Sequence, residues 1–240
     1  MKRKLSVFAL LASVSAFALP TARIELPAGL AAQAERLPIA GFGGYNKGDF
    51  RMTGYHGEFT RGESRLGIMD PLFVRNKGRS SFTLRESGEA ELIAADCEFV
   101  RKTLTIDVVT FDPKKMAYQC EFRRDGNLLG ARLVIGHPKP RGMKERFLAM
   151  DARRGESNIF DQHLLIESLH KYENSKFQSS APIGYVLSRD GQAIAALELT
   201  DVNPTIIVAT DLSSELRRSA IASALALAVL RDPANSALED

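Results

Sequence analysis

From Ser81 onward, short apolar runs alternate with turn signals, a pattern typical of antiparallel β proteins. Residues 103–111 form a β-branched run, and Asp-Gly pairs at 125–126 and 190–191 each separate two apolar runs, which predicts two β-hairpins. Both pairs follow an arginine and lie 65 residues apart. An internal duplication would explain this repeat, and two unrelated hairpins would produce the same pattern.

One stretch near the C-terminus departs from this pattern. Residues 219–230, SAIASALALAVL, are apolar or small on every side, and Asp211 or Ser213 can cap a helix before them. A helix of about 12 residues rises only ~18 Å, against a ~30 Å hydrocarbon core, so protein must enclose it. We therefore expect a mainly β (α+β) fold: a closed or nearly closed antiparallel β-barrel wrapped around a hydrophobic central helix over 214–231.

Two other segments lead to local predictions. Residues 158–174, NIFDQHLLIESLHKYEN, predict a short helix capped by Asn158. The glycine-rich segment 41–59 lacks the phosphate-loop string, so its glycines predict turns and bulges between short strands.

The N-terminus has the features of a secretory signal peptide. A basic start, an apolar run of about 15 residues and small residues at Ala16 and Ala18 predict cleavage after Ala18. We expect a signal peptide over 1–18, a linker over 19–40 and one domain over 41–240. The protein would then cross the inner membrane to the periplasm, with no transmembrane segment in the mature chain.

Export changes what the charge and the cysteines imply. Removing the three basic residues of the leader leaves 29 Lys and Arg against 29 Asp and Glu, so nothing favours a nucleic-acid partner. Cys97 and Cys120 would lie in an oxidising compartment, where a disulfide is possible. Two buried thiols fit the sequence equally well.

The C-terminal string 200–232, TDVNPTIIVATDLSSELRRSAIASALALAVLRD, resembles the signature of the tubby C-terminal-like, phospholipid scramblase and LURP-one-related superfamily. The matching positions are Thr200, Asp201, Asn203, Ile206, Asp211, Leu212, Arg217 and Ala220. The resemblance implies a twelve-stranded barrel around the central helix. The palmitoylation-type cysteine cluster and the acidic calcium segment of the scramblases are not recognisable, so scrambling and calcium dependence are not implied.

Tubby-like domains recognise phosphorylated lipid headgroups through basic side chains, and this chain has a basic loop over 136–147, GHPKPRGMKERF. Clustered cations can hold a phosphate or carboxylate by charge-assisted hydrogen bonds. The candidate anionic-ligand patch consists of His137, Lys139, Arg141, Lys144, Arg146, Arg153 and Arg154. A solvated loop with no ligand is the alternative interpretation.

Weaker candidates exist for enzymatic chemistry. His163, Glu167 and His170 would share one face of the expected helix and could bind a metal. The H-E-x-x-H order is missing, and the alternative that they form an exposed polar face is favoured over a metal site. His56, beside Glu58, could act as a general base. No serine-nucleophile elbow is present, and no motif predicts a cofactor.

These observations favour an exported, non-enzymatic binding module for an anionic or lipid-like ligand of the cell envelope. One alternative is a structural or protein-interaction component of the envelope, whose partner would be another envelope protein. A second is a hydrolase or metal-dependent enzyme that uses His56 or the trio of His163, Glu167 and His170.

Overall fold

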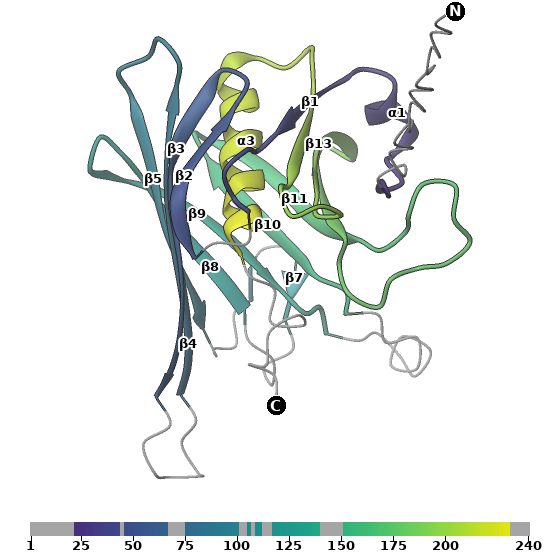
Figure 1. Ribbon diagram of the computed structural model, residues 1–240, viewed down its shortest axis with the longest axis horizontal. Coiled ribbons are helices and arrows are strands. Elements are labelled where there is room, and N and C mark those ends of the chain that lie inside the picture. The colour runs from purple at the N-terminus through teal and green to yellow at the C-terminus, as the bar shows by residue number, and fades with distance from the viewer. Residues whose placement is uncertain are drawn as a thin grey trace, which may run out of the picture.

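The computed structural model describes residues 22–43, 46–66, 75–100, 105–106, 109–111, 117–139 and 151–230. The expected signal peptide lies outside these residues. The described chain is dominated by strands, with one long helix close to its end (Figure 1).

Twelve strands form one antiparallel sheet that curves into a nearly closed barrel, as the sequence predicted (Figure 1). In spatial order they are β1 (Ala34–Pro38), β14 (Thr205–Ala209), β13 (Gln192–Glu198), β12 (Gly184–Arg189), β11 (Gln162–Leu169), β10 (Arg154–Ile159), β9 (Asn127–Gly136), β8 (Ala117–Arg124), β5 (Leu92–Val100), β4 (Arg75–Glu86), β3 (Tyr55–Leu66) and β2 (Lys47–Met52). Two short strands, β6 (Thr105–Ile106) and β7 (Val109–Thr110), pair separately.

The seam of the barrel lies between β1 and β2, the two outermost strands of the sheet. Ala40 and Arg51 exchange backbone hydrogen bonds of 2.8 and 2.9 Å across it. Gly41 lies at the seam with φ of 100°, and a Cβ there would lie 2.3 Å from the Asp49 carbonyl oxygen. Only glycine accommodates both the positive φ and this close approach, which accounts for one of the glycines after residue 40.

The helix α3 (Ser214–Val229) lies inside the barrel and contacts β3, β4 and β5 on one side and β10 to β14 on the other (Figure 1). Every residue from Ser219 to Val229 is buried, which explains why this helix has no polar face. The Ser223 hydroxyl lies 2.8 Å from that of Ser157 in β10, so this buried polar group is satisfied. Within the described residues, no helix combines the length and apolar character needed to cross a membrane.

The two ends of the barrel differ. At the end where α3 begins, the strands are joined by tight turns, and Asp125, Gly126, Asp190 and Gly191 adopt positive φ as the two predicted hairpins require. At the end where α3 finishes, longer connections join the strands. We call this the long-loop end: β1, β3, β5, β9, β11 and β13 end here, and β2, β4, β8, β10, β12 and β14 begin here.

The prediction of a helix over 158–174 is wrong, because residues 158–169 belong to the hairpin of β10 and β11. Its turn is Phe160 and Asp161, with φ of 55° and 57°, and neither residue marks a tight turn as Asn-Gly or Asp-Gly would. Contacts of the Phe160 ring stabilise this turn. The ring packs on the core, and the Arg124 guanidinium lies over it, 4.6 Å from the ring centroid.

Residues 24–40, expected to belong to a linker, form part of the folded domain instead. The short helix α1 (Ala28–Ala31) and the chain before it cover the outer face of β12 to β14, and Ile24 and Leu30 are buried there. The Glu198 carboxylate accepts hydrogen bonds from the Ile24 backbone (2.8 Å) and from Arg36 (2.6 Å). β13 and β14 are therefore buried on both faces, and their apolar runs do not alternate with polar residues.

Cys97 and Cys120 lie directly opposite each other on β5 and β8 and are joined by a disulfide. Both are buried against the core around α3. The bond closes a loop with a sequence separation of 23 residues.

A carboxylate introduced inside the barrel tests the enclosure of α3. Leu225 is fully buried, so Leu225→Asp should abolish cooperative folding, because an unpaired buried charge costs several kcal/mol against a total stability of about 5–15 kcal/mol. Leu225→Met, which conserves volume, should cost less than about 1.5 kcal/mol. Circular dichroism during thermal unfolding measures both, and an unchanged transition in Leu225→Asp would rule out a central helix.

The disulfide should stabilise the barrel by about 3 kcal/mol, because it restricts the unfolded chain over this loop length. Urea unfolding of the Cys97→Ala, Cys120→Ala double variant should show that loss. Wild-type protein treated with a reductant serves as the control and should unfold at a similarly lowered urea concentration. Two titratable thiols in the untreated native protein would contradict the pairing.

Candidate functional site

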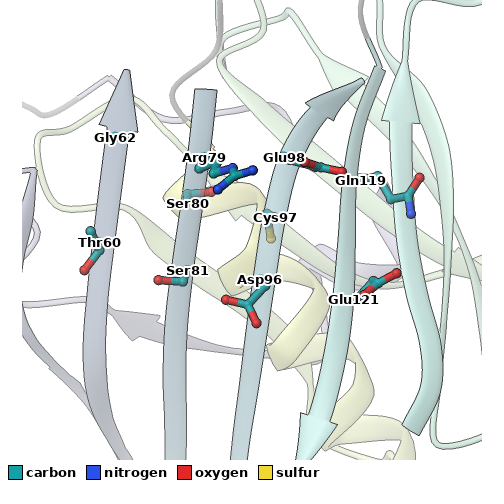
Figure 2. A pocket seen from close by; sticks show the side chains of 10 residues that line it. All are labelled: Thr60, Gly62, Arg79, Ser80, Ser81, Asp96, Cys97, Glu98, Gln119 and Glu121. Carbon is teal, nitrogen blue, oxygen red and sulfur yellow. The ribbon is translucent and has the colours of Figure 1, made fainter. Parts of the chain in front are cut away.

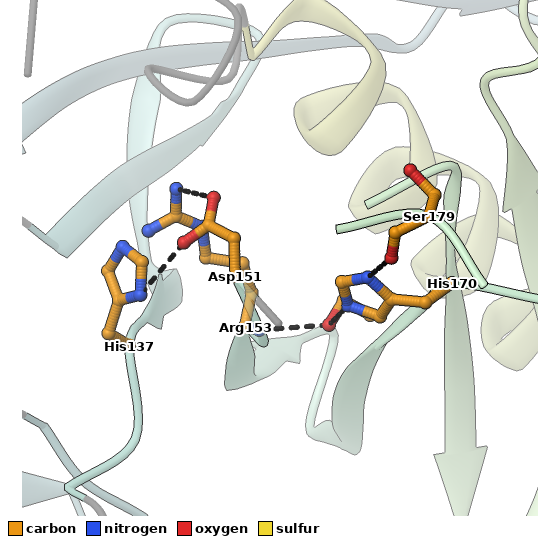
Figure 3. A network of polar contacts seen from close by, with 6 residues as sticks. His137, Asp151, Arg153, His170 and Ser179 are labelled. Carbon is orange, nitrogen blue, oxygen red and sulfur yellow. Dashed lines mark hydrogen bonds and ion pairs between the residues drawn. The ribbon is translucent and has the colours of Figure 1, made fainter. Parts of the chain in front are cut away.

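Asp151 joins two members of the predicted anionic-ligand patch at the long-loop end. His137 Nδ1 lies 3.1 Å from one carboxylate oxygen of Asp151, and Arg153 donates to the other at 2.8 Å (Figure 3). His137 and Arg153 are both buried. Their polar groups therefore face Asp151 rather than solvent. Asp151 connects His137, at the start of the basic loop, to Arg153, which follows the loop in the chain.

A second set of contacts continues from Arg153 into the next loop. The Arg153 backbone N–H donates to Ser168 Oγ at 2.8 Å, and Ser168 Oγ lies 2.9 Å from His170 Nε2. His170 Nδ1 lies 3.0 Å from the Ser179 carbonyl oxygen, which can only accept. In the neutral imidazole the proton is therefore on Nδ1, and Nε2 accepts from the Ser168 hydroxyl.

This pairing of hydroxyl and imidazole also occurs at serine nucleophiles. Here Ser168 Oγ additionally accepts a backbone hydrogen bond across the β10–β11 ladder, so the pair links the two strands. Backbone bonds extend the network, since Asp151 donates to the Ser180 carbonyl at 2.8 Å and Ser179 to the His170 carbonyl at 2.7 Å. The loops over 137–153 and 170–183 are thus joined at their bases.

The remaining members of the patch fall into three groups. Lys139 is exposed. Arg154 is half-exposed and pairs with Glu167 at 3.0 Å on the outer face of the β10–β11 hairpin. Arg141, Lys144 and Arg146 lie outside the described residues. His137, Arg153 and Arg154 thus have carboxylate partners, which leaves Lys139, Arg141, Lys144 and Arg146 as the cations to test for ligand binding.

The residues of the predicted metal trio do not come together, because the segment is a strand. His163 and Glu167 are on the outer face, where His163 lies 3.2 Å from Glu156, while His170 is buried in the network described above. Among the residues that the structure describes, no group of three or more His, Cys, Asp or Glu side chains could hold a metal ion.

His56, the predicted general base, is exposed on β3. Its cross-strand neighbours are Arg51 on β2 and Arg85 on β4. Its register partners on both sides are therefore arginines rather than a carboxylate that could orient a general base.

A hollow of about 430 Å³ lies on the outer face of β3, β4, β5 and β8 (Figure 2). Arg79 and Glu98, which line it, are register partners, and Asp96 and Glu121 line it as well (Figure 2). Three carboxylates therefore face one guanidinium in this lining. Its charge is opposite in sign to that of the basic loop, so the hollow does not extend the anionic-ligand patch.

Reasoning from the sequence missed Asp151, Ser168 and Ser179. The sequence does contain a signal for the role of Asp151. An acid two residues before Arg153, after several basic residues, can form an ion pair with them. Ser168 and Ser179 have none, because their roles depend on which loops the barrel brings together.

No protein-family model, no curated protein and no solved structure matches this chain.

Proposed function

We propose that this protein is an exported, non-enzymatic binding module that holds an anionic or lipid-like ligand of the cell envelope at its long-loop end. The observation that carries the proposal is the network around Asp151. It joins the two ends of the segment 138–150, because His137 and Arg153, on either side of that segment, contact Asp151 at 3.1 and 2.8 Å. Four cations, Lys139, Arg141, Lys144 and Arg146, belong to the chain between those ends.

The distribution of charged residues also favours the long-loop end as the binding site. Asp151 already interacts with His137 and Arg153, and Glu167 with Arg154, so these acids are occupied by other partners. The segment over 138–150 contains four basic residues and one acid, Glu145. Cations grouped in this way favour phosphate or carboxylate through charge-assisted hydrogen bonds.

We also propose that the barrel belongs to the tubby C-terminal-like, phospholipid scramblase and LURP-one-related superfamily. The signature over 200–232 supports this, together with twelve antiparallel strands around a C-terminal helix. Export to the periplasm is supported by the leader-like N-terminus and by the disulfide between Cys97 and Cys120, because disulfides persist in oxidising compartments.

Removing the four cations should weaken binding to anionic vesicles. Each basic side chain near an anionic surface contributes about 1 kcal/mol, so a variant with Lys139, Arg141, Lys144 and Arg146 changed to Ala should bind on the order of a hundred- to a thousandfold less tightly at low salt. Cosedimentation with phosphatidylcholine vesicles containing phosphatidylglycerol measures this loss, and added salt should reduce wild-type binding.

A matched control changes the net charge equally but elsewhere. Arg51, Arg85, Arg123 and Arg132 lie on strands away from the long-loop end, and their replacement by Ala should leave most of the binding intact. Equal losses in both variants would show that only net charge matters. Equal binding by the wild type and the first variant, or binding by neither, would remove the basic loop from consideration.

A further inference from the structure

The hollow on the outer face of β3, β4, β5 and β8 has a polar lining whose side chains make few contacts with one another (Figure 2). Its volume of about 430 Å³ lies within the range of ligand sites, ~300–1,000 Å³. Within the described part of the chain, six of its side chains form no hydrogen bond or ion pair: Thr60, Arg79, Ser81, Glu98, Gln119 and Glu121. Their donors and acceptors are therefore available to a ligand.

The lining side chains form two rows across the sheet, because they are register partners on successive strands. The first row consists of Thr60, Ser81, Asp96 and Glu121. The second row consists of Gly62, Arg79, Glu98 and Gln119. Neighbouring strands lie about 4.8 Å apart, and residues two apart along a strand about 6.8 Å, so the sheet holds these polar groups at fixed spacings.

Arginines at the edge of the hollow balance its carboxylates. Each of the three carboxylates has an arginine on a neighbouring strand: Arg123 at 3.5 Å from Asp96, Arg79 as the register partner of Glu98, and Arg132 as that of Glu121. Equal numbers of the two charges give a cation no advantage over a neutral ligand. The hollow therefore fits a ligand that forms hydrogen bonds with both kinds of group.

Gly62 lies in the second row, where neither packing nor a positive φ requires glycine. A Cβ there would meet only the Arg79 carbonyl oxygen, at 3.7 Å, which is an ordinary contact. At Gly78 on β4, by contrast, a Cβ would lie 2.7 Å from the Phe99 ring. Glycine weakens the interior of a strand and often marks close approach by a ligand or another backbone. At Gly62 the approach of a ligand accounts for it.

We propose that this hollow binds a neutral oligosaccharide through hydrogen bonds to its hydroxyl groups. A hydroxyl both donates and accepts, so it pairs with every kind of side chain in the lining. Glu98 and Glu121 accept from the sugar, Arg79 donates to it, and Gln119 does both. The site is separate from the basic loop, so the inference goes beyond the proposed function.

Other classes of ligand fit the hollow less well. Apolar ligands bind where aliphatic and aromatic side chains predominate, and none of the residues given for this lining is aliphatic or aromatic. A basic peptide would meet three arginines in and around the hollow, Arg79, Arg123 and Arg132. A polyhydroxylated, uncharged ligand avoids both costs.

Gly62→Val tests the site by filling it without removing a polar group. Valine favours strands, so the melting temperature should stay the same or rise. The wild type is first screened on an array of neutral glycans that includes chitopentaose, cellopentaose and maltopentaose, and calorimetric titration then measures its affinity for the bound glycan. The valine variant should bind that glycan at least about tenfold less tightly, because the side chain occupies space that the sugar needs.

Gln119→Ala provides a second variant, which removes a donor and an acceptor from the other end of the same row. It should weaken glycan binding about tenfold, since hydrogen bonds to the sugar are lost. Glu58→Ala is the matched control, because Glu58 is exposed on β3 outside the lining. Its glycan affinity should equal that of the wild type. Added salt should change wild-type binding little, because the ligand is uncharged.

The remaining outcomes overturn the inference. Binding of no glycan on the array would do so, as would equal glycan affinity in the wild type, Gly62→Val and Gln119→Ala. Binding of tetralysine instead, lost in Gly62→Val and suppressed by salt, would assign the hollow to a cationic partner. Cosedimentation of Gly62→Val with phosphatidylglycerol vesicles should match that of the wild type, so failure here and failure of the proposed function are distinguishable.

Discussion

The fold depends on how the barrel satisfies the last carbonyl groups of α3, which lie where water is excluded. The final four carbonyls of a helix have no partner within it, and each would be costly to leave unpaired. Tyr118 on β8 donates to the Ala226 carbonyl at 3.2 Å, and Arg61 on β3 donates to the Ala228 carbonyl at 3.0 Å. Burial raises the pKa of the Tyr118 phenol far above its usual range, so the donor keeps its proton.

Arg61 also connects the helix to the seam of the barrel. Its guanidinium lies 4.6 Å from the centroid of the Phe42 ring, and Phe42 stacks on Phe59 at 4.4 Å beside the β1–β2 gap. A cation near the C-terminus of a helix is also favoured by the helix dipole. At the other end, Arg217 pairs with Glu35 on β1 and Arg218 with Glu91 before β5, so the helix is attached to both halves of the sheet.

The sequence predicted the features that local chemistry determines. The two Asp-Gly hairpins and the buried helix, with Ser213 as its cap, are present, because turn residues and an apolar surface on all sides impose these conformations directly. The hairpin at Phe160 was missed, because the core and Arg124 hold that turn rather than its own residues. His170 could not be placed, since its burial follows from contacts with Ser179 in a loop closed only by the barrel.

The candidate site shows why a count of cations in a sequence overstates a binding patch. Three of its seven predicted members interact with carboxylates, and two of these, His137 and Arg153, are buried. Their role is positional: by sharing Asp151 they hold together the ends of the segment that contains the other four. A buried basic side chain that is paired with a carboxylate contributes little to the attraction of a ligand at the surface. The contacts therefore assign a structural role to these three and leave Lys139, which is exposed, with Arg141, Lys144 and Arg146 as the side chains on which the proposed binding depends.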